Sequence, residues 1–257
     1  MLRRTGLILA YDNDTFDAND EDRLGEILPH VDMVKVGLQS YTSLDQNGVS
    51  TAWKVEQFCK RKAMRDWKLL DIENTVTKAL KNILLMGTGM VTLHAQMSDD
   101  GLSSAATLCK NSGTLPLAVT VLTDLDDAQC RTRFMPENAT YAGKFVDVLV
   151  ENFTRNAYRC GIRGFVCSAL EAKLIREVAS RAIIVTPAIR PLWAVKPDDQ
   201  KRVTTPAQAV EAGADYMVIG RPILQPPQGM SSSEAARRIR DEADKALPPG
   251  SIVDKTV

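Results

Sequence analysis

Eight short runs of aliphatic and β-branched residues recur along the chain, and most of them precede a longer segment in which apolar residues have helical spacing. This alternation predicts βα units and a parallel sheet. The predicted strands cover residues 7–11, 33–36, 63–66, 90–94, 117–122, 164–167, 183–186 and 216–219. Because eight parallel strands can close on themselves, the sequence predicts an α/β protein with the (β/α)8, or TIM barrel, fold.

The predicted helices are less regular than the strands. Helical spacing is clear over residues 49–60, 76–86, 102–110, 141–159, 170–178 and 207–212, and weaker around residues 20–28. A last helix is predicted over Ser232–Lys245, after a cluster of serines and before two prolines. The longest irregular stretch, residues 187–206, would be the loop after the seventh strand, at the catalytic end of a barrel.

The length and charge of the chain limit its organisation and its partners. The 257 residues match the usual length of one α/β barrel, and no linker rich in Gly and Ser interrupts the series. We therefore expect one domain over residues 1–257, with the active site at the carboxyl ends of the strands. The 32 Lys and Arg residues balance 32 Asp and Glu residues, and this balance argues against binding to nucleic acid or to an anionic membrane.

The cysteine content and the hydropathy of the chain indicate the cellular compartment in which the protein is expected. The five cysteines have no spacing typical of a metal site, and their odd number argues against a disulfide framework. The apolar runs are too short to cross a membrane, and the N-terminal residues lack the apolar core of a signal peptide. We expect a cytoplasmic protein.

Charged residues gather at the ends of the first three predicted strands. Asp12 follows the first strand, Lys35 lies in the second, and Asp66 ends the third. On an extended strand Asp66 and Lys68 point to the same face, because they are two residues apart. The carboxylates and ammonium groups would then alternate and hold each lysine in its charged form. The alternative is a salt-bridge network that only closes one end of the barrel.

A second polar cluster follows the last two predicted strands. Gly220 and Arg221 come directly after the eighth strand, and Arg190 and Gln200 lie in the loop after the seventh. Loops at these positions are the usual phosphate site of such barrels. A glycine lets backbone N–H groups approach an anion, and an arginine supplies a two-pronged donor. The cluster predicts a phosphorylated ligand, and the alternative is a turn with a surface arginine.

Short motifs follow the order of the predicted strands. They are Leu9-Ala10-Tyr11-Asp12, Val34-Lys35-Val36-Gly37, Asp66-Trp67-Lys68-Leu69-Leu70-Asp71, Leu93-His94-Ala95, Thr186-Pro187-Ala188 and Val218-Ile219-Gly220-Arg221-Pro222. Together they resemble the orotidine 5′-phosphate decarboxylases of the bacterial type. The resemblance implies a dimeric barrel and a carboxy-lyase that converts orotidine 5′-phosphate to UMP, in the last step of de novo pyrimidine synthesis. It also implies that the reaction needs no metal or organic cofactor.

The resemblance also assigns catalytic roles. Lys68 would be the general acid that protonates C6 of the pyrimidine, and Asp66 and Asp71 would flank it. Lys35 would complete the charged array, and Asp12 with Lys35 would hold the ribose hydroxyls.

The remaining site residues are also implied by the resemblance. Thr123 would lie beside the pyrimidine. The phosphate would be bound by Arg190, Gln200, Gly220 and Arg221. Asp71 and Thr75 would reach into the active site of the neighbouring subunit, which would make the homodimer part of the catalytic machinery.

The sequence departs from the family pattern at three places. Glu73 stands where a proline is usual, Ala188 replaces the glycine of Thr-Pro-Gly, and Gln96 with Met97 replaces small residues. These departures affect loop geometry, dimer contacts and the path of the phosphate loop. The basic residues at 60–65 are also unusual for the start of a buried strand.

Two other functions remain open. One is a phosphosugar decarboxylase or epimerase on a related barrel, which stabilises an enediolate with Mg2+. Such a site needs a further carboxylate at the second strand, where this chain has Lys35. The other is a non-catalytic nucleotide-binding barrel that keeps only the phosphate site. His94 is expected to pack at a strand end, and Trp67 and Trp193 are expected to serve as packing or lid residues.

Overall fold

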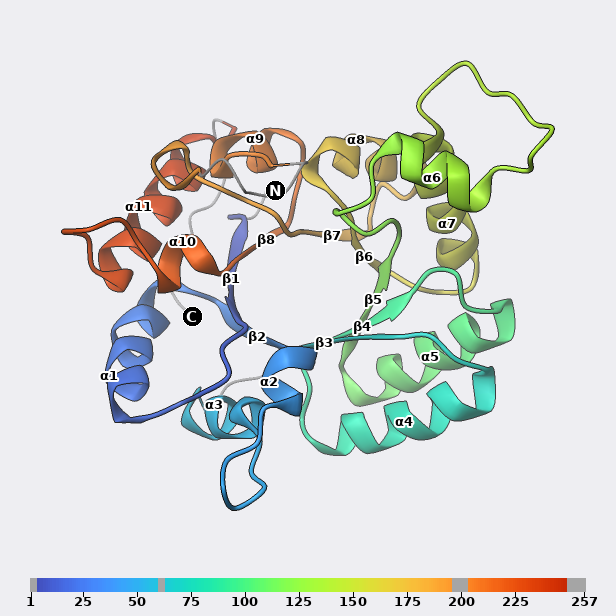
Figure 1. Cartoon of the computed structure of the whole chain (residues 1–257). Helices are drawn as coiled ribbons and strands as arrows, with labels where there is room; N and C mark the ends of the chain where they lie inside the picture. Colours follow the sequence, from blue (N-terminus) through green and yellow to red (C-terminus); the bar gives the residue numbers. More distant parts are fainter. Residues whose placement is uncertain (1–3, 60–62, 196–202, 249–257) are drawn as a thin grey trace.

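Eight parallel strands form a closed barrel in the order in which they occur along the chain. The computed structural model describes residues 4–59, 63–195 and 203–248. Figure 1 looks along the barrel and shows the helices as an outer ring around the strands. The predicted (β/α)8 fold is therefore confirmed.

All eight predicted strands are present. They are β1 (Gly6–Tyr11), β2 (Met33–Gly37), β3 (Met64–Leu69), β4 (Met90–His94), β5 (Leu115–Val119), β6 (Gly164–Val166), β7 (Ile183–Thr186) and β8 (Tyr216–Ile219). Two boundaries differ from the prediction by three residues. Strand β3 continues past Asp66 to Leu69, and β5 ends at Val119 rather than at residue 122.

The main helices also follow the prediction. They are α1 (Ala18–Ile27), α3 (Thr51–Cys59), α4 (Glu73–Leu85), α5 (Asp99–Ser112), α7 (Phe145–Arg159), α8 (Ala169–Val178), α9 (Pro206–Glu211) and α11 (Ser232–Lys245). Helices α4 and α5 begin three residues before their predicted starts. Their first turns are polar, so apolar spacing does not reveal them, and in α5 the Ser98 side chain caps Gly101 N–H.

Several short elements were not predicted. They are α2 (Leu38–Thr42), α6 (Asp127–Phe134), α10 (Arg221–Leu224) and the 3-10 turns η1 (Leu28–His30) and η2 (Leu192–Ala194). The predicted helix over residues 141–159 is wrong at its start, because α7 begins only at Phe145. The preceding segment is a loop that projects from the barrel with α6 (Figure 1).

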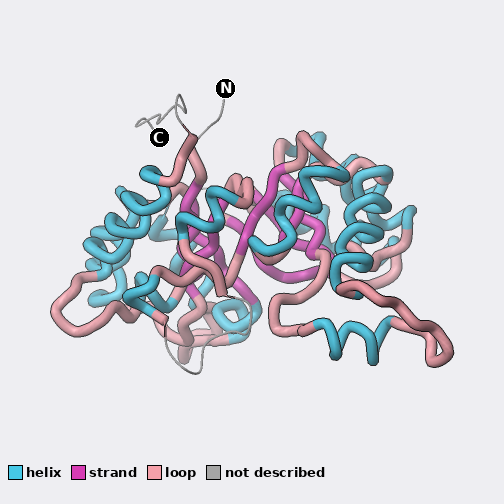
Figure 2. Tube along the Cα trace, turned by 90° about the horizontal axis from the view of Figure 1, so that it is seen from above, coloured by secondary structure: helices cyan, strands magenta, loops and turns pink. Residues whose placement is uncertain are grey.

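Apolar side chains fill two concentric layers. Inside the barrel lie alternate residues of the strands: Ile8, Ala10, Met64, Met90, Leu117, Val119, Val166, Val185 and Val218. The opposite faces of the strands pack against the helices, which enclose the strands in Figure 2. In the described ranges, no helix is both long and apolar enough to cross a membrane.

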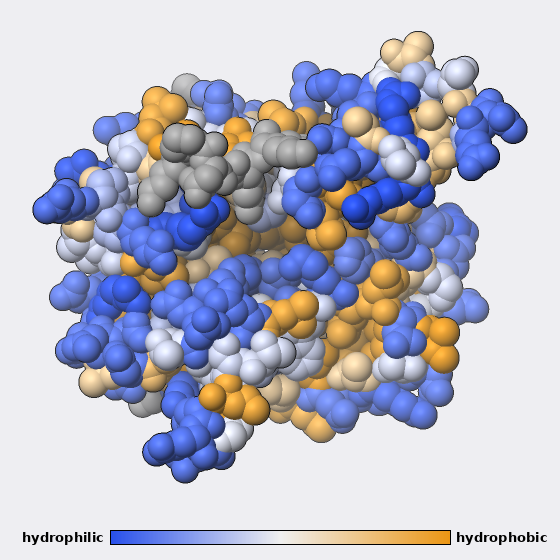
Figure 3. Space-filling view, viewed as in Figure 1, coloured by the Kyte–Doolittle hydropathy of each residue, from blue (hydrophilic) through white to orange (hydrophobic). Residues whose placement is uncertain are grey.

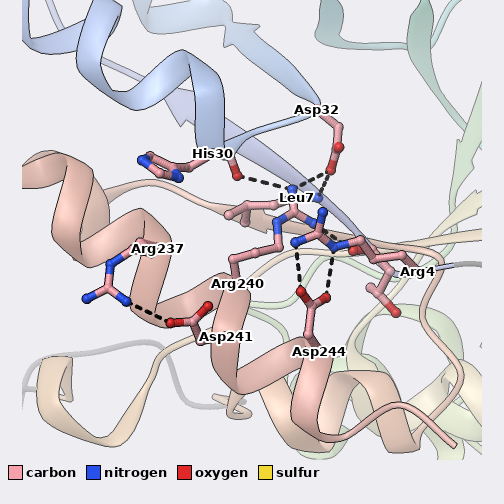
Figure 4. Close-up of polar contacts among 9 residues, drawn as sticks. Arg4, Leu7, His30, Asp32, Arg237, Arg240, Asp241 and Asp244 are labelled. Carbon is pink, nitrogen blue, oxygen red and sulfur yellow. Dashed lines mark hydrogen bonds and ion pairs between the residues drawn. The ribbon is translucent and has the colours of Figure 1, made fainter. Parts of the chain in front are cut away.

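A buried arginine of α11 lies near the amino end of the barrel. Arg240 donates to the carbonyl oxygen of Thr5 at 2.9 Å and to Asp32 Oδ2 at 2.7 Å. Asp32 Oδ2 also accepts from Leu7 N at 2.6 Å (Figure 4). This network joins α11 to β1 and to the turn before β2, far from the carboxyl ends of the strands.

The structure shows how Arg65, one of the basic residues before Asp66, is accommodated in β3. Its side chain is buried on the outer face of β3 and lies 2.8 Å from Glu56 Oε2 of α3. The guanidinium also donates to the Tyr41 hydroxyl at 2.9 Å and to Thr88 Oγ1. The positive charge in this strand is therefore neutralised between β3 and its helices, and it does not enter the barrel.

Candidate active site

A cavity of about 570 Å³ opens at the carboxyl ends of the strands. Its lining includes these residues predicted for the site: Asp12, Lys35, Asp66, Lys68, Thr123, Arg190, Gly220 and Arg221. Figure 3 shows this face, with hydrophilic side chains (blue) beside a central hollow and apolar side chains (orange) on the side of α4 and α5. These residues come from β2 and β3 and from the segments that follow β1, β5, β7 and β8, and they meet at one place.

Four charged side chains form a row in which the sign of the charge alternates. Lys35 Nζ lies 2.9 Å from Asp12 Oδ1 and 3.2 Å from Asp66 Oδ2. The other oxygen of the same carboxylate, Asp66 Oδ1, lies 2.9 Å from Lys68 Nζ. The predicted array of Asp12, Lys35, Asp66 and Lys68 is therefore formed, with Asp66 shared by the two lysines.

The inner half of this row is shielded from water. The side chains of Lys35 and Asp66 are 9% and 13% exposed, and that of Lys68 is 34% exposed. Burial alone raises the pKa of Asp66, but the charges of Lys35 and Lys68, with hydrogen bonds from Lys68 and Thr92, hold that pKa below its ordinary value. Asp66 is therefore ionised at neutral pH and keeps an ammonium group on each side.

The backbone at Lys68 is irregular, which corrects the prediction of a regular extended strand there. Lys68 has a φ of +48°, in the left-handed region. For a residue other than glycine, this backbone conformation is less stable than the usual ones by about 1–2 kcal/mol. The pairing of β3 with β4 also shifts between Arg65 and Leu69. Lys68 and Asp66 still meet, but through a bulge in β3 and not through simple alternation.

Thr92 is a site-forming residue that the sequence analysis missed. Its Oγ1 accepts from Lys68 N at 2.9 Å and lies 3.0 Å from Asp66 Oδ1. The only signal in the sequence is a polar residue in the middle of the aliphatic run of β4. A buried strand threonine of this kind has many structural explanations, so the signal alone does not identify a site.

Asp71 and Thr75 lie away from the cavity of their own chain. Both side chains are exposed, and neither belongs to the lining formed by the described residues. Asp71 Oδ1 accepts from the adjacent backbone N–H of Ile72 at 2.7 Å. The structure of one chain thus brings Asp66 and Lys68 together but leaves Asp71 outside the row.

Gly220 and two arginines surround the predicted phosphate side. A Cβ at Gly220 would lie 3.1 Å from the carbonyl oxygen of Ala10, so glycine allows the end of β8 to pass close to β1. Arg190 is buried and Arg221 is exposed, and both line the cavity. Gln200 lies outside the described residues.

The three departures have different structural consequences. Glu73 is accommodated in the first turn of α4, where its Oε1 accepts from Thr77 and Ser104 at 3.0 Å each. Ala188 has a φ of +64°, so it occupies a conformation that suits glycine. Gln96 is exposed, and Met97 is buried in the outer core.

The aromatic residues and His94 have the expected packing positions. Trp67 packs edge-on against Tyr41, with ring centroids 4.6 Å apart, and Trp193 packs against the outer core. His94 is half-buried at the end of β4. Burial, and then the charge of Lys68, lower the pKa of His94, so its ring is neutral at pH 7. Across the described ranges, no group of three His, Cys, Asp or Glu side chains forms a metal-type cluster.

Comparisons with known proteins extend this description. Residues 5–239 match the model of the orotidine 5′-phosphate decarboxylase / HUMPS family. The chain is similar to the crystal structure of orotidine 5′-phosphate decarboxylase from Lactobacillus acidophilus, with a TM-score of 0.70, 27% identity, and coverage of 94% of this chain and 99% of that one. An uncharacterized conserved protein from Geobacillus kaustophilus has a TM-score of 0.68 and 24% identity, with coverage of 92% and 99%, which shows a shared fold.

Proposed function

The chain belongs to the orotidine 5′-phosphate decarboxylase / HUMPS family, and from that premise we propose that it decarboxylates orotidine 5′-phosphate to UMP. This reaction would be the last step of de novo pyrimidine synthesis. The observation that carries the proposal is the row of Asp12, Lys35, Asp66 and Lys68 at the mouth of the barrel. We further propose a cytoplasmic enzyme that forms one domain over residues 1–257.

The charged row suits the chemical problem of this reaction. When the bond from C6 to the carboxylate breaks, CO2 leaves and the electron pair stays on C6, where no π-system delocalises it. A fixed ammonium group stabilises that charge and then neutralises it by giving up a proton. In our proposal Lys68 does both, because it is the more exposed of the two lysines and lies at the cavity.

Asp66 and Lys35 would keep the proton donor in place. Asp66 Oδ1 lies 2.9 Å from Lys68 Nζ, and Lys35 balances the charge of the same carboxylate from the other side. The ammonium group of Lys68 is therefore oriented before substrate arrives, so little reorganisation is needed during the reaction. Lys35 and Asp12 would also hold the ribose hydroxyls.

The rest of the cavity would bind the two ends of the nucleotide. Thr123 would lie beside the pyrimidine. Arg190, Gly220 and Arg221, together with Gln200, would bind the phosphate. Because the phosphate is remote from C6, its binding energy would serve to orient the substrate and to favour closure of the site.

We propose that a homodimer completes each site, with Asp71 and Thr75 contributed in trans. Both residues are exposed, and Asp71 lies between Leu70 and Ile72 in the sequence, which are 54% and 69% exposed. Exposed apolar side chains next to a cavity mouth are typical of a surface that a partner covers. An isologous dimer would supply the same contribution to both sites.

The position of Lys35 argues against magnesium-dependent phosphosugar chemistry. Its ammonium lies between the carboxylates of Asp12 and Asp66, at 2.9 and 3.2 Å. Two carboxylates that could share a magnesium ion are thus already bridged by a positive charge. We therefore propose turnover without a metal or an organic cofactor.

The deciding experiment measures CO2 release from orotidine 5′-phosphate and formation of UMP by the purified protein after exhaustive treatment with EDTA. We expect turnover that EDTA does not reduce. If EDTA abolishes activity and Mg2+ restores it, the metal-free mechanism is wrong. If the protein binds UMP tightly but releases no CO2, it is a non-catalytic nucleotide-binding barrel.

A further inference from the structure

Thr92 occupies an inward-facing position in β4. Met90 of the same strand lies inside the barrel, whereas Val91 and Leu93 pack against the outer helices. Since side chains alternate along a strand, Thr92 shares the inner face with Met90, and it is completely buried. A hydroxyl in such a place is costly unless it has hydrogen-bond partners.

The partners of this hydroxyl belong to the proposed catalytic pair. Thr92 Oγ1 lies 2.9 Å from Lys68 N and 3.0 Å from Asp66 Oδ1. A backbone N–H can only donate, so the hydroxyl accepts from Lys68 and gives its single hydrogen to the carboxylate of Asp66. One side chain therefore bridges the backbone of the lysine and the side chain of the acid.

The bridge stands opposite the bulge in β3. Arg65 pairs with Val91 and Leu69 pairs with Leu93, so four residue steps on β3 face two on β4. The residue between Val91 and Leu93 is Thr92. Its hydroxyl thus accepts a hydrogen bond from the backbone N–H of Lys68, where the regular pairing of β3 with β4 is interrupted. The φ of Lys68 at this point is +48°.

We propose that Thr92 is a positioning residue, whose hydroxyl holds the bulge of β3 in the form that sets Lys68 and Asp66 side by side. This inference rests on the proposed function, because it assigns Thr92 to the decarboxylation. Thr92 is not part of the cavity lining among the described residues, so it acts through Lys68 and Asp66 and does not bind the substrate.

The charge state of Asp66 gives a readout that reports on this bridge. Asp66 is faced by Lys35 from β2, by Lys68 from its own strand and by His94 from β4, and Asp12 lies beyond Lys35. The hydrogen bond from Thr92 is one of the interactions that lower the pKa of Asp66. Its loss raises that pKa, so a larger fraction of the enzyme carries a protonated Asp66 at low pH.

The test compares Thr92→Val, which keeps the shape but lacks the hydroxyl, with Thr92→Ser, which keeps the hydroxyl. CO2 release from orotidine 5′-phosphate is measured across a range of pH. For Thr92→Val we expect kcat to fall about 10- to 100-fold with KM changed less than about threefold. The acid limb of its kcat/KM profile should move to higher pH. Thr92→Ser should restore both kcat and the position of the limb.

Thr114→Val is the matched control for loss of a buried hydroxyl. Thr114 Oγ1 donates to the carbonyl oxygen of Thr88 at 2.8 Å, just before the first residue of β5, at the amino end of the barrel. This variant should lower the melting temperature but leave kcat and the acid limb unchanged. If Thr92→Val fails to fold, Thr92→Ala takes its place against Thr92→Ser, with the same expected shift of the acid limb.

Each outcome decides a separate question. If the wild type releases no CO2, the proposed function fails. If the wild type is active and the hydroxyl-free variants of Thr92 keep its kcat and acid limb, the positioning role is wrong. The positioning role is also wrong if Thr92→Ser loses as much kcat as the hydroxyl-free variants of Thr92. The same holds if Thr114→Val loses as much kcat as those variants.

Discussion

Lys35 Nζ lies 3.2 Å from Asp66 Oδ2, and both side chains are largely withdrawn from water at the base of the charged row. Removing one member of a buried pair leaves the other charge uncompensated, so the two side chains depend on each other. The outer lysine, Lys68, contacts the same carboxylate but is more exposed. The row therefore has a fixed inner pair and an outer ammonium group that faces the cavity.

Lys68→Ala should abolish nearly all turnover while the protein stays folded. Lys68 lies at the cavity mouth and is 34% exposed, so its removal creates no core cavity, whereas the proposed proton donor is lost. CO2 release and thermal unfolding should be measured together. Lys173→Ala, at an exposed position of α8, is the control and should remain fully active. Near-normal kcat in Lys68→Ala would remove this lysine from the mechanism.

Arg221→Ala should weaken binding of the phosphate group. Arg221 lines the cavity directly after Gly220, and a guanidinium pairs well with phosphate. We expect kcat/KM for orotidine 5′-phosphate to fall by about 10- to 100-fold, which corresponds to the loss of a charge-assisted hydrogen bond. The loss should be much smaller with a substrate that lacks the phosphate. An equal loss with both substrates would show that Arg221 does not act through the phosphate.

A mixture of Lys68→Ala and Asp71→Ala should regain activity that neither variant has alone. If Asp71 acts across the dimer, each site combines Lys68 of one chain with Asp71 of the other. In a mixed dimer, one site then contains both substitutions and the other site contains neither. Random exchange of equal amounts should then restore about a quarter of all sites. Exchange of subunits must be demonstrated separately, for example with two differently tagged chains. If exchange occurs and the mixture stays inactive, Asp71 acts within its own chain.

Ala188→Gly should stabilise the protein. The φ of +64° at Ala188 is strained for a residue with a Cβ, and glycine adopts it freely. After subtracting the greater backbone entropy of glycine in the unfolded chain, we expect a gain of up to about 1 kcal/mol in the free energy of unfolding. Denaturation in urea measures it. The control Ala128→Gly, at an exposed helical position of α6, should instead destabilise. A loss of stability in Ala188→Gly would contradict the strain argument.

Arg240→Ala should destabilise the fold without changing kcat of the folded enzyme. Arg240 is 6% exposed and ties α11 to Thr5 and Asp32 at the end of the barrel opposite the cavity (Figure 4). Its loss takes the guanidinium donor away from the Asp32 carboxylate and from the buried carbonyl oxygen of Thr5, which costs about 2–4 kcal/mol. On the same helix, Arg237→Ala breaks only the exposed pair with Asp241 and should cost less than about 0.5 kcal/mol. Equal losses in the two variants would rule out the proposed importance of the buried network.

The order of the strands and the meeting of the charged residues at one end of the barrel were predictable from the sequence. The eight apolar runs and the helical segments between them specify a barrel, because local spacing is a direct consequence of strand and helix geometry. Once the barrel is expected, residues at the ends of successive strands must meet, and Asp12, Lys35 and Asp66 do so. Motif order then indicated the family, which the family model also matches.

Only the tertiary structure decided how Lys68 is held. The left-handed φ of Lys68, the bulge of β3 and the hydroxyl of Thr92 form one arrangement, in which residues 24 and 26 positions apart are joined. The pairs of Arg65 with Glu56 and of Arg240 with Asp32 likewise join separate elements of the chain. Local periodicity tells which face of a strand or helix is apolar, but not which polar groups meet across the folded chain. Those partners are fixed only when the barrel closes and each buried donor and acceptor must be satisfied.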